Sequence, residues 1–484
     1  MTKVMRSGGY LMAALVITAV LALALGRGEG YAEPQDRLAP AVQAFVQAHP
    51  GAPVPVIIQT ASPASALRLG GEMRSATNVA DLPIAGAVAA TLTATDVERL
   101  ARDPDVEFVS LDAPMVSSGK DDVVDASKLA TAYPFAANAV GAWQSGLTGK
   151  GVTVAVIDSG LAAAKQFGDR SLGTYDFASS TDSLADENGH GTYVAGIIAA
   201  RDDKFMGIAP DALVLSLKVS GRDGAALASD VITALQWTVD HQDEFGIRVV
   251  NISLNSSIAD SYRQDPLSAA VEQAWFHGIV VVASAGNYGS AADAVDHAPA
   301  NDPYVITAGA FDDRGTAAAA DDAALSWSGR GATVDGYAKP DVLAPGAGIV
   351  STLANKSALA AHGDVVQGQY IRLSGTSASA AIVSGAVALM LQRHPELTPD
   401  QVKDRLTATG GPVAGSGAPR IDALAAATTD VAGSANLDAR PNELIDAQTG
   451  DIMYDSVLWR SVLWRSVLWR NVLWRSTTEE LLWP

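Results

Sequence analysis

Apolar, strand-like segments alternate with helix-like segments between about residues 130 and 430. The expected strands are short and rich in Val, Ile and Leu, and they lie at residues 152–157, 213–219, 248–254 and 279–283. Helices are expected between them, at residues 191–200, 230–242 and 267–277. Continuous apolar strands separated by helices are typical of a parallel sheet that is covered on both faces. The sequence therefore predicts an α/β fold, a three-layer αβα domain with a mainly parallel sheet.

Polar residues follow two of these elements where a cleft is expected. Asp158 comes directly after the first strand, and its carboxylate needs a partner there because it cannot continue an apolar strand. His190 lies between two glycines at the start of an expected helix. In open α/β sheets the functional site lies outside the carboxyl ends of the strands. Taken singly, Asp158 could be a helix cap and His190 an ordinary buried or surface histidine.

A third polar turn, Gly375-Thr376-Ser377, leads into a helix of small residues expected at residues 380–391. A hydroxyl at a helix N-terminus lies near unpaired N–H groups, which favour negative charge. The simpler interpretation is that Thr376 or Ser377 caps the helix. Capping does not explain why Asp158, His190 and Ser377 each occupy a turn that contains glycine.

The three turns resemble the motifs of the subtilisin-like serine peptidases. These motifs are Asp-Ser-Gly at residues 158–160, His-Gly-Thr at 190–192 and Gly-Thr-Ser at 375–377, and their order along the chain is that of the subtilisin triad. The resemblance covers most of residues 141–427. It implies that Ser377 is the nucleophile, that His190 accepts its proton and that Asp158 orients His190.

The same resemblance implies an oxyanion hole and a substrate cleft. The oxyanion donors would be the side chain of Asn287 and the amide of Ser377, although Gly286-Asn287 could also be an ordinary turn. The substrate-binding residues would be Ser253, Leu254, Asn255, Ala283, Ser284, Ala285 and Gly286. Asn255 stands where the family usually has glycine, so its side chain is expected to narrow the pocket.

Two segments precede the large domain. Residues 1–32 have the pattern of a signal peptide, because Lys3 and Arg6 precede an apolar run at 10–25 and Ala32 suits cleavage. An uncleaved membrane anchor is the alternative, and secretion or an extracellular location is the prediction. Residues 33–120 predict a small α+β, ferredoxin-like domain that resembles the inhibitory propeptide of the family.

The secondary structure of this small domain is predicted in outline. Strands are expected at residues 54–59, 84–92 and 106–111. A capping box that starts at Thr95 is expected to begin a helix between them. The polar residues 117–122 are expected to form a linker that is cleaved, so the catalytic domain would span residues 121–430.

A repeated tail ends the chain. Residues 431–484 are expected to form a linker followed by four copies of a five-residue repeat, Val-Leu-Trp-Arg preceded by Ser or Asn, which begin at Ser456, Ser461, Ser466 and Asn471. A period of five suits neither a helix stripe nor one face of a strand. The tail could dock to a protein or a cell surface, or it could be a tandem duplication without a binding role.

Charge and composition limit the partners. The net charge of −20 argues against nucleic acid as a partner, and the absence of cysteine excludes thiol catalysis and disulfides. The predicted chemistry requires no cofactor. Structural calcium is possible at Asp182, Asp186 and Glu187, or at Asp293 and Asp296. Given the overall negative charge, solvated acidic loops explain these residues better, so no metal ligand is assigned.

The sequence as a whole predicts a secreted, self-processing serine endopeptidase that hydrolyses protein or peptide substrates and whose own propeptide acts as an intramolecular inhibitor. Two alternatives remain open. A peptide ligase or cyclase would use the same three residues but transfer the acyl group to an amine. A surface-binding protein without catalysis would act through its Trp- and Arg-rich tail.

Overall fold

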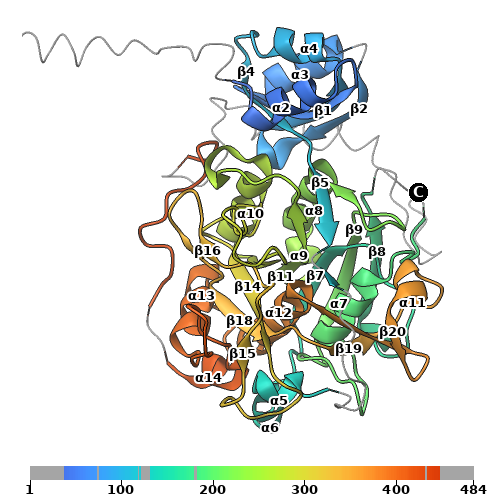
Figure 1. The fold of residues 1–484 in the computed structure, drawn as a ribbon, viewed down its shortest axis with the longest axis vertical. Helices are drawn as coiled ribbons and strands as arrows, with labels where there is room; N and C mark the ends of the chain where they lie inside the picture. The colour runs from blue at the N-terminus through green and yellow to red at the C-terminus, as the bar shows by residue number, and fades with distance from the viewer. Residues whose placement is uncertain are drawn as a thin grey trace, which may run out of the picture.

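The structure is a computed structural model that describes residues 37–73, 76–117, 119–120, 131–178, 183–430 and 433–446. The expected signal peptide and the pentad repeats lie outside the described residues. Figure 1 shows a small N-terminal domain against one end of a larger domain. Within the described residues no helix is both long enough and apolar enough to cross a membrane.

The N-terminal domain is an antiparallel sheet with helices. Its strands, in the spatial order β2-β3-β1-β4, are β1 (Val54–Thr60), β2 (Thr77–Leu82), β3 (Ala87–Leu92) and β4 (Val106–Leu111). Its helices are α2 (Pro40–Ala48), α3 (Pro63–Glu72) and α4 (Ala94–Leu100). The predicted α+β domain is confirmed, and α2, α3 and β2 are elements that the sequence analysis missed.

Both faces of this small sheet are buried. Side chains alternate along a strand, so Val56 and Ile58 of β1 enter the core of the small domain while Ile57 enters the core of the large one. The short 3-10 turn η1 (Pro83–Ala85) contacts the large domain's helices α8 (Ala228–Asp240) and α10 (Pro266–Phe276). The small domain is therefore docked onto the large one through one face of its sheet.

Two boundaries in the small domain were predicted wrongly. Helix α4 is capped by Thr93, whose hydroxyl accepts a hydrogen bond from the N–H of Asp96, so no capping box begins at Thr95. Thr93 still has the extended backbone of the preceding strand, as an N-cap residue requires. The strand expected from residue 84 begins only at Ala87, because η1 and Gly86, with a φ of 61°, form a turn first.

The large domain is built on a mainly parallel sheet in the order β15-β14-β13-β11-β7-β9-β8, with β18 beside β14. Only β15 runs antiparallel to its neighbour. The strands are β7 (Thr153–Asp158), β8 (Ser171–Asp176), β9 (Leu213–Lys218), β11 (Ile247–Ile252), β13 (Val280–Ser284), β14 (Ile306–Asp312), β15 (Ala323–Ala324) and β18 (Val342–Pro345).

Helices cover this sheet and complete the three predicted layers. Helix α7 (His190–Ala199) packs against α12 (Thr376–Arg393), and both contact the sheet. Helices α8 and α10 form a second pair, which also carries the small domain. The remaining helices of the described domain are α5 (Tyr133–Ala136), α6 (Ala139–Gln144), α9 (Gln242–Phe245), α11 (Ala358–His362), α13 (Pro399–Ala408) and α14 (Ala423–Thr428). The predicted αβα fold is confirmed.

Helix α12 begins at Thr376 rather than at residue 380. Its N-cap is Gly375, which makes no side-chain capping bond, so the simpler interpretation in which Thr376 or Ser377 caps the helix is wrong. The N–H of Thr376 is bound instead by the side chain of Asn287, which belongs to a distant segment. Ser377 therefore lies in the first turn of the helix, where the N–H groups have no partner within the helix.

Residues 433–446, expected to be part of a linker, dock onto the large domain. The backbone N–H of Asn442 donates to both carboxylate oxygens of Glu272, at 3.0 and 2.9 Å. The side-chain amide of Asn442 donates to the carbonyl oxygens of Tyr262 and Asp265. Asn442 is 0% exposed, and Ile445 is also buried. This segment is therefore part of the packed domain.

We expect Asn442→Ala to lower the free energy of unfolding by about 1–3 kcal/mol, because it removes the two buried hydrogen bonds from the Asn442 amide to the carbonyl oxygens of Tyr262 and Asp265. Urea denaturation followed by circular dichroism measures this change. Leu437→Ala is the matched control in the same segment, since the Leu437 side chain is 81% exposed. Equal stability of the two variants would contradict a docking role for Asn442.

Candidate active site

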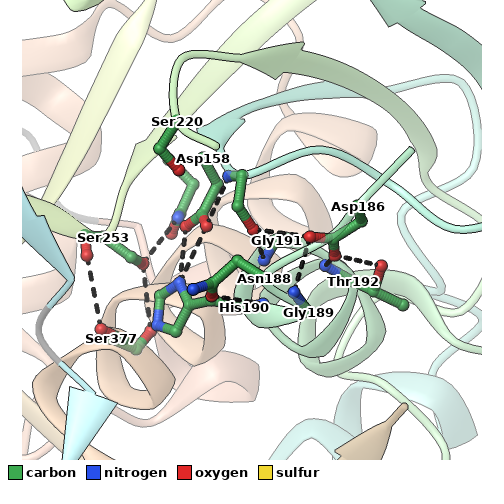
Figure 2. A network of polar contacts seen from close by, with 12 residues as sticks. Asp158, Asp186, Asn188, Gly189, His190, Gly191, Thr192, Ser220, Ser253 and Ser377 are labelled. Carbon is green, nitrogen blue, oxygen red and sulfur yellow. Dashed lines mark hydrogen bonds and ion pairs between the residues drawn. The ribbon is translucent and has the colours of Figure 1, made fainter. Parts of the chain in front are cut away.

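Asp158, His190 and Ser377 meet at the carboxyl edge of the parallel sheet, as Figure 2 shows. Asp158 is the last residue of β7, His190 is the first residue of α7, and Ser377 is the second residue of α12. Ser377 contacts Ser253, which follows β11, the neighbour of β7. Strand ends and helix starts thus bring the three residues together from positions far apart in the sequence.

The closest polar contact in this group joins His190 and Asp158. Nδ1 of His190 lies 2.8 Å from Oδ1 and 2.9 Å from Oδ2 of Asp158, and both side chains are buried. Burial alone would lower the pKa of His190, but the charge and hydrogen bond of Asp158, together with the charge of Asp186, raise this pKa above its ordinary value. A ring that donates through Nδ1 is left with Nε2 as its acceptor.

Ser377 lies beside this pair without a hydrogen bond to it. Its hydroxyl donates to the carbonyl oxygen of Ser253 at 3.4 Å, and Nε2 of His190 has no hydrogen-bond partner among the described residues. Figure 2 draws the His190 ring between Asp158 and Ser377. A hydrogen bond between a catalytic base and its nucleophile is often long or poorly aligned at rest, and it tightens in the complex that reacts. The unpaired Nε2 is the atom to which the Ser377 proton could move.

Asp186 connects the turns that carry Asp158 and His190. Its Oδ1 accepts hydrogen bonds from the Ser159 hydroxyl at 2.8 Å and the Gly189 N–H at 2.7 Å. Its Oδ2 accepts from the N–H and the hydroxyl of Thr192. Burial raises the pKa of Asp186, although these donors oppose the rise. The carboxylate, considered above as a possible calcium ligand, is thus surrounded by donors from the protein.

Lys218 is a second connection that the sequence analysis did not identify. The buried Nζ donates to the carbonyl oxygens of Ser159 at 2.8 Å, Ala185 at 3.1 Å and Ser220 at 2.8 Å. It therefore links the turn after β7, the loop before His190 and the end of β9. Burial lowers the pKa of Lys218, and Asp186 is the strongest of the opposing charges. The sequence does contain a signal for this residue, because Lys218 is a charged residue at the end of an otherwise apolar strand.

Asn287 lies at the start of the helix that carries Ser377. Its carboxamide oxygen accepts hydrogen bonds from the N–H and from the hydroxyl of Thr376, each at 3.1 Å. These two bonds hold the plane of the amide at the N-terminus of α12. The structure therefore places the predicted oxyanion donors, Asn287 and the amide of Ser377, at the same end of the helix.

The protein's own chain runs through the cleft beside Ser377. Strand β5 (Pro114–Ser117) pairs with β10 (Ala226–Leu227) on one side and with β12 (Leu254–Ser256) on the other. Strand β6 (Gly119–Lys120) then pairs with Ser374 and Gly375, just before Ser377. The described part of the expected polar linker at residues 117–122 is therefore strand rather than linker, because the edges of the cleft supply backbone partners.

The seven predicted substrate-binding residues form two segments at this cleft. Ser253, Leu254 and Asn255 follow β11, and the last two belong to β12, which pairs with β5. Ala283 and Ser284 end β13, and Ala285 and Gly286 follow it directly before Asn287. The two segments are joined by a hydrogen bond from Nδ2 of Asn255 to the carbonyl oxygen of Ser284 at 2.8 Å.

Acidic groups that could hold a metal ion do not assemble in the described part of the chain. No set of three or more His, Asp or Glu residues there has the geometry of a metal site. Asp296, one of the candidates, accepts a hydrogen bond from the N–H of Val334. Asp182 lies outside the described residues.

Comparison with known sequences and structures gives consistent matches. The sequence profile of the Subtilase family matches residues 149–438. The chain is 39% identical over 272 residues to serine protease AprX of Bacillus subtilis, a match that covers 54% of this chain and 61% of AprX. It is 32% identical over 329 residues to subtilisin E of the same organism, covering 67% of this chain and 75% of that relative.

The solved structure of fervidolysin from Fervidobacterium pennivorans has a similar fold, with a TM-score of 0.62 and 23% sequence identity. The match covers 78% of this chain and 61% of fervidolysin. The chain thus spans less than two thirds of AprX and of fervidolysin but three quarters of subtilisin E.

Proposed function

This chain belongs to the subtilase family, and from that premise we propose that it is a secreted serine endopeptidase that cuts its own chain to release the small N-terminal domain. The observation that carries the proposal is the buried contact of His190 with Asp158, at 2.8 Å, with the unpaired Nε2 of His190 beside Ser377. Protein and peptide substrates follow from this chemistry. The reaction itself requires no cofactor.

The proposed mechanism uses the atoms of this site in turn. Oγ of Ser377 attacks the peptide carbonyl while Nε2 of His190 accepts the hydroxyl proton, and Asp158 stabilises the resulting imidazolium. Asn287 and the N–H of Ser377 donate to the oxyanion. The tetrahedral intermediate collapses, and the leaving amine takes the proton from His190. Water then attacks the acyl-enzyme by the same route and releases the carboxylic acid.

The paths of β5 and β6 support cleavage of the protein's own chain. Ser117, the last residue of β5, lies opposite Leu254, and Gly119, the first residue of β6, lies opposite Gly375. Ser117 and Gly119 are therefore each paired with a segment that lies beside Ser377. We propose that cleavage occurs at one of the two peptide bonds that join these residues, and that β5 occupies the position of a substrate strand and so inhibits the enzyme until it leaves.

Intact mass spectrometry of the protein in the culture medium tests this proposal. We expect wild type to begin at Ser118 or Gly119, and Ser377→Ala to keep the N-terminal domain joined. Ser145→Ala is the matched control, because Ser145 is exposed and remote from the cleft. Identical processing of wild type and Ser377→Ala would contradict self-cleavage, and retention of every variant in the cells would contradict secretion.

A further inference from the structure

We propose that Asn255 restricts the pocket for the side chain that precedes the cleaved bond, so that the enzyme cuts after small residues (Gly, Ala or Ser) and not after large aromatic ones. This inference rests on the proposed peptidase function and specifies its substrate class.

Two backbone segments, one on each side of Ser377, form the walls of this pocket. Strand β12 pairs with the protein's own β5 and so forms one wall of the cleft. The segment after β13 forms the other wall, because Asn287 bonds to Thr376 next to Ser377. A substrate residue held at Ser377 must direct its side chain either to solvent or between these two walls.

Asn255 closes the space between the walls. Its Nδ2 donates to the carbonyl oxygen of Ser284 at 2.8 Å, and the Ser284 hydroxyl donates back to Oδ1 of Asn255 at 3.2 Å. Asn255 is 1% exposed, with β5 paired against β12. A large substrate side chain would have to separate these groups and leave buried polar atoms unpaired, which is unfavourable.

Neighbouring contacts prevent the walls from moving apart easily. Nδ1 of His297 donates to the carbonyl oxygen of Ser256, the residue after Asn255, at 2.9 Å. The His297 ring stacks on Tyr288 at a centroid distance of 4.4 Å. Because Tyr288 follows Asn287 directly, these contacts connect β12 to the opposite wall a second time. Two sets of contacts therefore link the walls of the pocket: the hydrogen bonds between Asn255 and Ser284, and the contacts of His297 with Ser256 and Tyr288.

The sequence at the proposed cleavage point agrees with this restriction. Ser117, Ser118 and Gly119 are all small, so either candidate bond is preceded by serine. An enzyme that accepted only large side chains would not cut there. This observation is independent of the contacts of Asn255.

The test compares two peptide p-nitroanilides that differ only in the last residue, alanine or phenylalanine, with enzyme expressed from the full chain. We expect wild type to favour alanine by at least about tenfold in kcat/KM, the scale on which pocket size discriminates. Asn255→Gly should raise the Phe/Ala ratio of kcat/KM by about tenfold or more. Ser284→Ala, which removes one of the two mutual bonds, should shift the ratio in the same direction by less.

Asn138→Gly is the matched control. Asn138 bonds to Asp422, away from the cleft, and its φ of 54° suits glycine, so the ratio should remain that of wild type. Wild type that cuts after phenylalanine as readily as after alanine would overturn the inference, and so would an unchanged ratio in both Asn255→Gly and Ser284→Ala. If the peptidase proposal itself is wrong, neither peptide is hydrolysed and a fluorophosphonate probe does not label Ser377.

Discussion

Replacing Asp158 by asparagine is expected to lower kcat about ten-thousandfold while the protein still folds. The carboxylate accepts a hydrogen bond from the N–H at Nδ1 of His190, which keeps the ring proton on Nδ1 and leaves Nε2 as the acceptor. An asparagine amide can donate to Nδ1 instead, which moves the ring proton to Nε2. His190 could then no longer accept the proton of Ser377. Steady-state kinetics with a p-nitroanilide peptide measures the loss.

The same variant should shift the pH profile of the remaining activity. His190 must be neutral to act as a base, so activity falls as the pH drops below its pKa. The charge and hydrogen bond of Asp158 and the charge of Asp186 outweigh burial and raise this pKa in wild type. In Asp158→Asn the raising effect of Asp158 is lost, so the acid limb of kcat/KM should move to lower pH.

Asp169→Asn is the control for both measurements, because Asp169 is an exposed carboxylate whose replacement changes the net charge equally. It should leave both the rate and the acid limb close to those of wild type. A loss of less than tenfold in Asp158→Asn would remove Asp158 from the proposed mechanism. An acid limb that stays in place would show that another group titrates.

Replacing Asn287 by alanine is expected to lower kcat by about a hundred- to a thousandfold, with a much smaller change in KM. The Nδ2 donor acts on the negative charge that develops on the carbonyl oxygen, and this charge is largest in the transition state. The amide also has a structural role, because its oxygen binds the N–H and hydroxyl of Thr376. Alanine removes both functions, so it cannot separate them.

Asn287→Asp separates the two functions. Aspartate keeps an oxygen that can accept from Thr376 but has no N–H to donate to the oxyanion, so it should lose activity as severely as Asn287→Ala. Thermal unfolding of the three proteins shows whether the start of α12 remains intact. Asn287→Asp with nearly wild-type kcat would contradict the oxyanion role.

The sequence predicted the large domain better than the small one. Strands at residues 152–157 and 279–283 were recognised within one or two residues, because a strand buried on both faces is continuously apolar. In the large domain Thr398 and Gln401 form a capping box, and both of its hydrogen bonds are present. In the small domain Thr93 and Thr95 offer competing caps two residues apart, and local pattern alone could not choose between them.

Segments that interact with distant parts of the chain were interpreted less well. Residues 117–120 were predicted to be a polar linker because the strands that they pair with, β12 and β21 (Tyr370–Gly375), lie more than a hundred residues away in the sequence. Residues 433–446 read as linker for the same reason, since Asn442 binds Glu272 on α10. A polar sequence indicates that a segment stays outside the apolar core. It does not show whether the backbone of that segment forms hydrogen bonds with a distant strand.

The sequence by itself determined the αβα layering and the placing of Asp158, His190 and Ser377 at strand ends and helix starts. Both follow from the order of apolar and polar residues along neighbouring positions, which is a local property. Only the tertiary structure decided that Lys218 and Asp186 join the two turns, that β5 lies in the cleft and that Asn255 meets Ser284. These contacts depend on which strands are neighbours in the sheet, and strand order is set by packing of the whole chain rather than by any one segment.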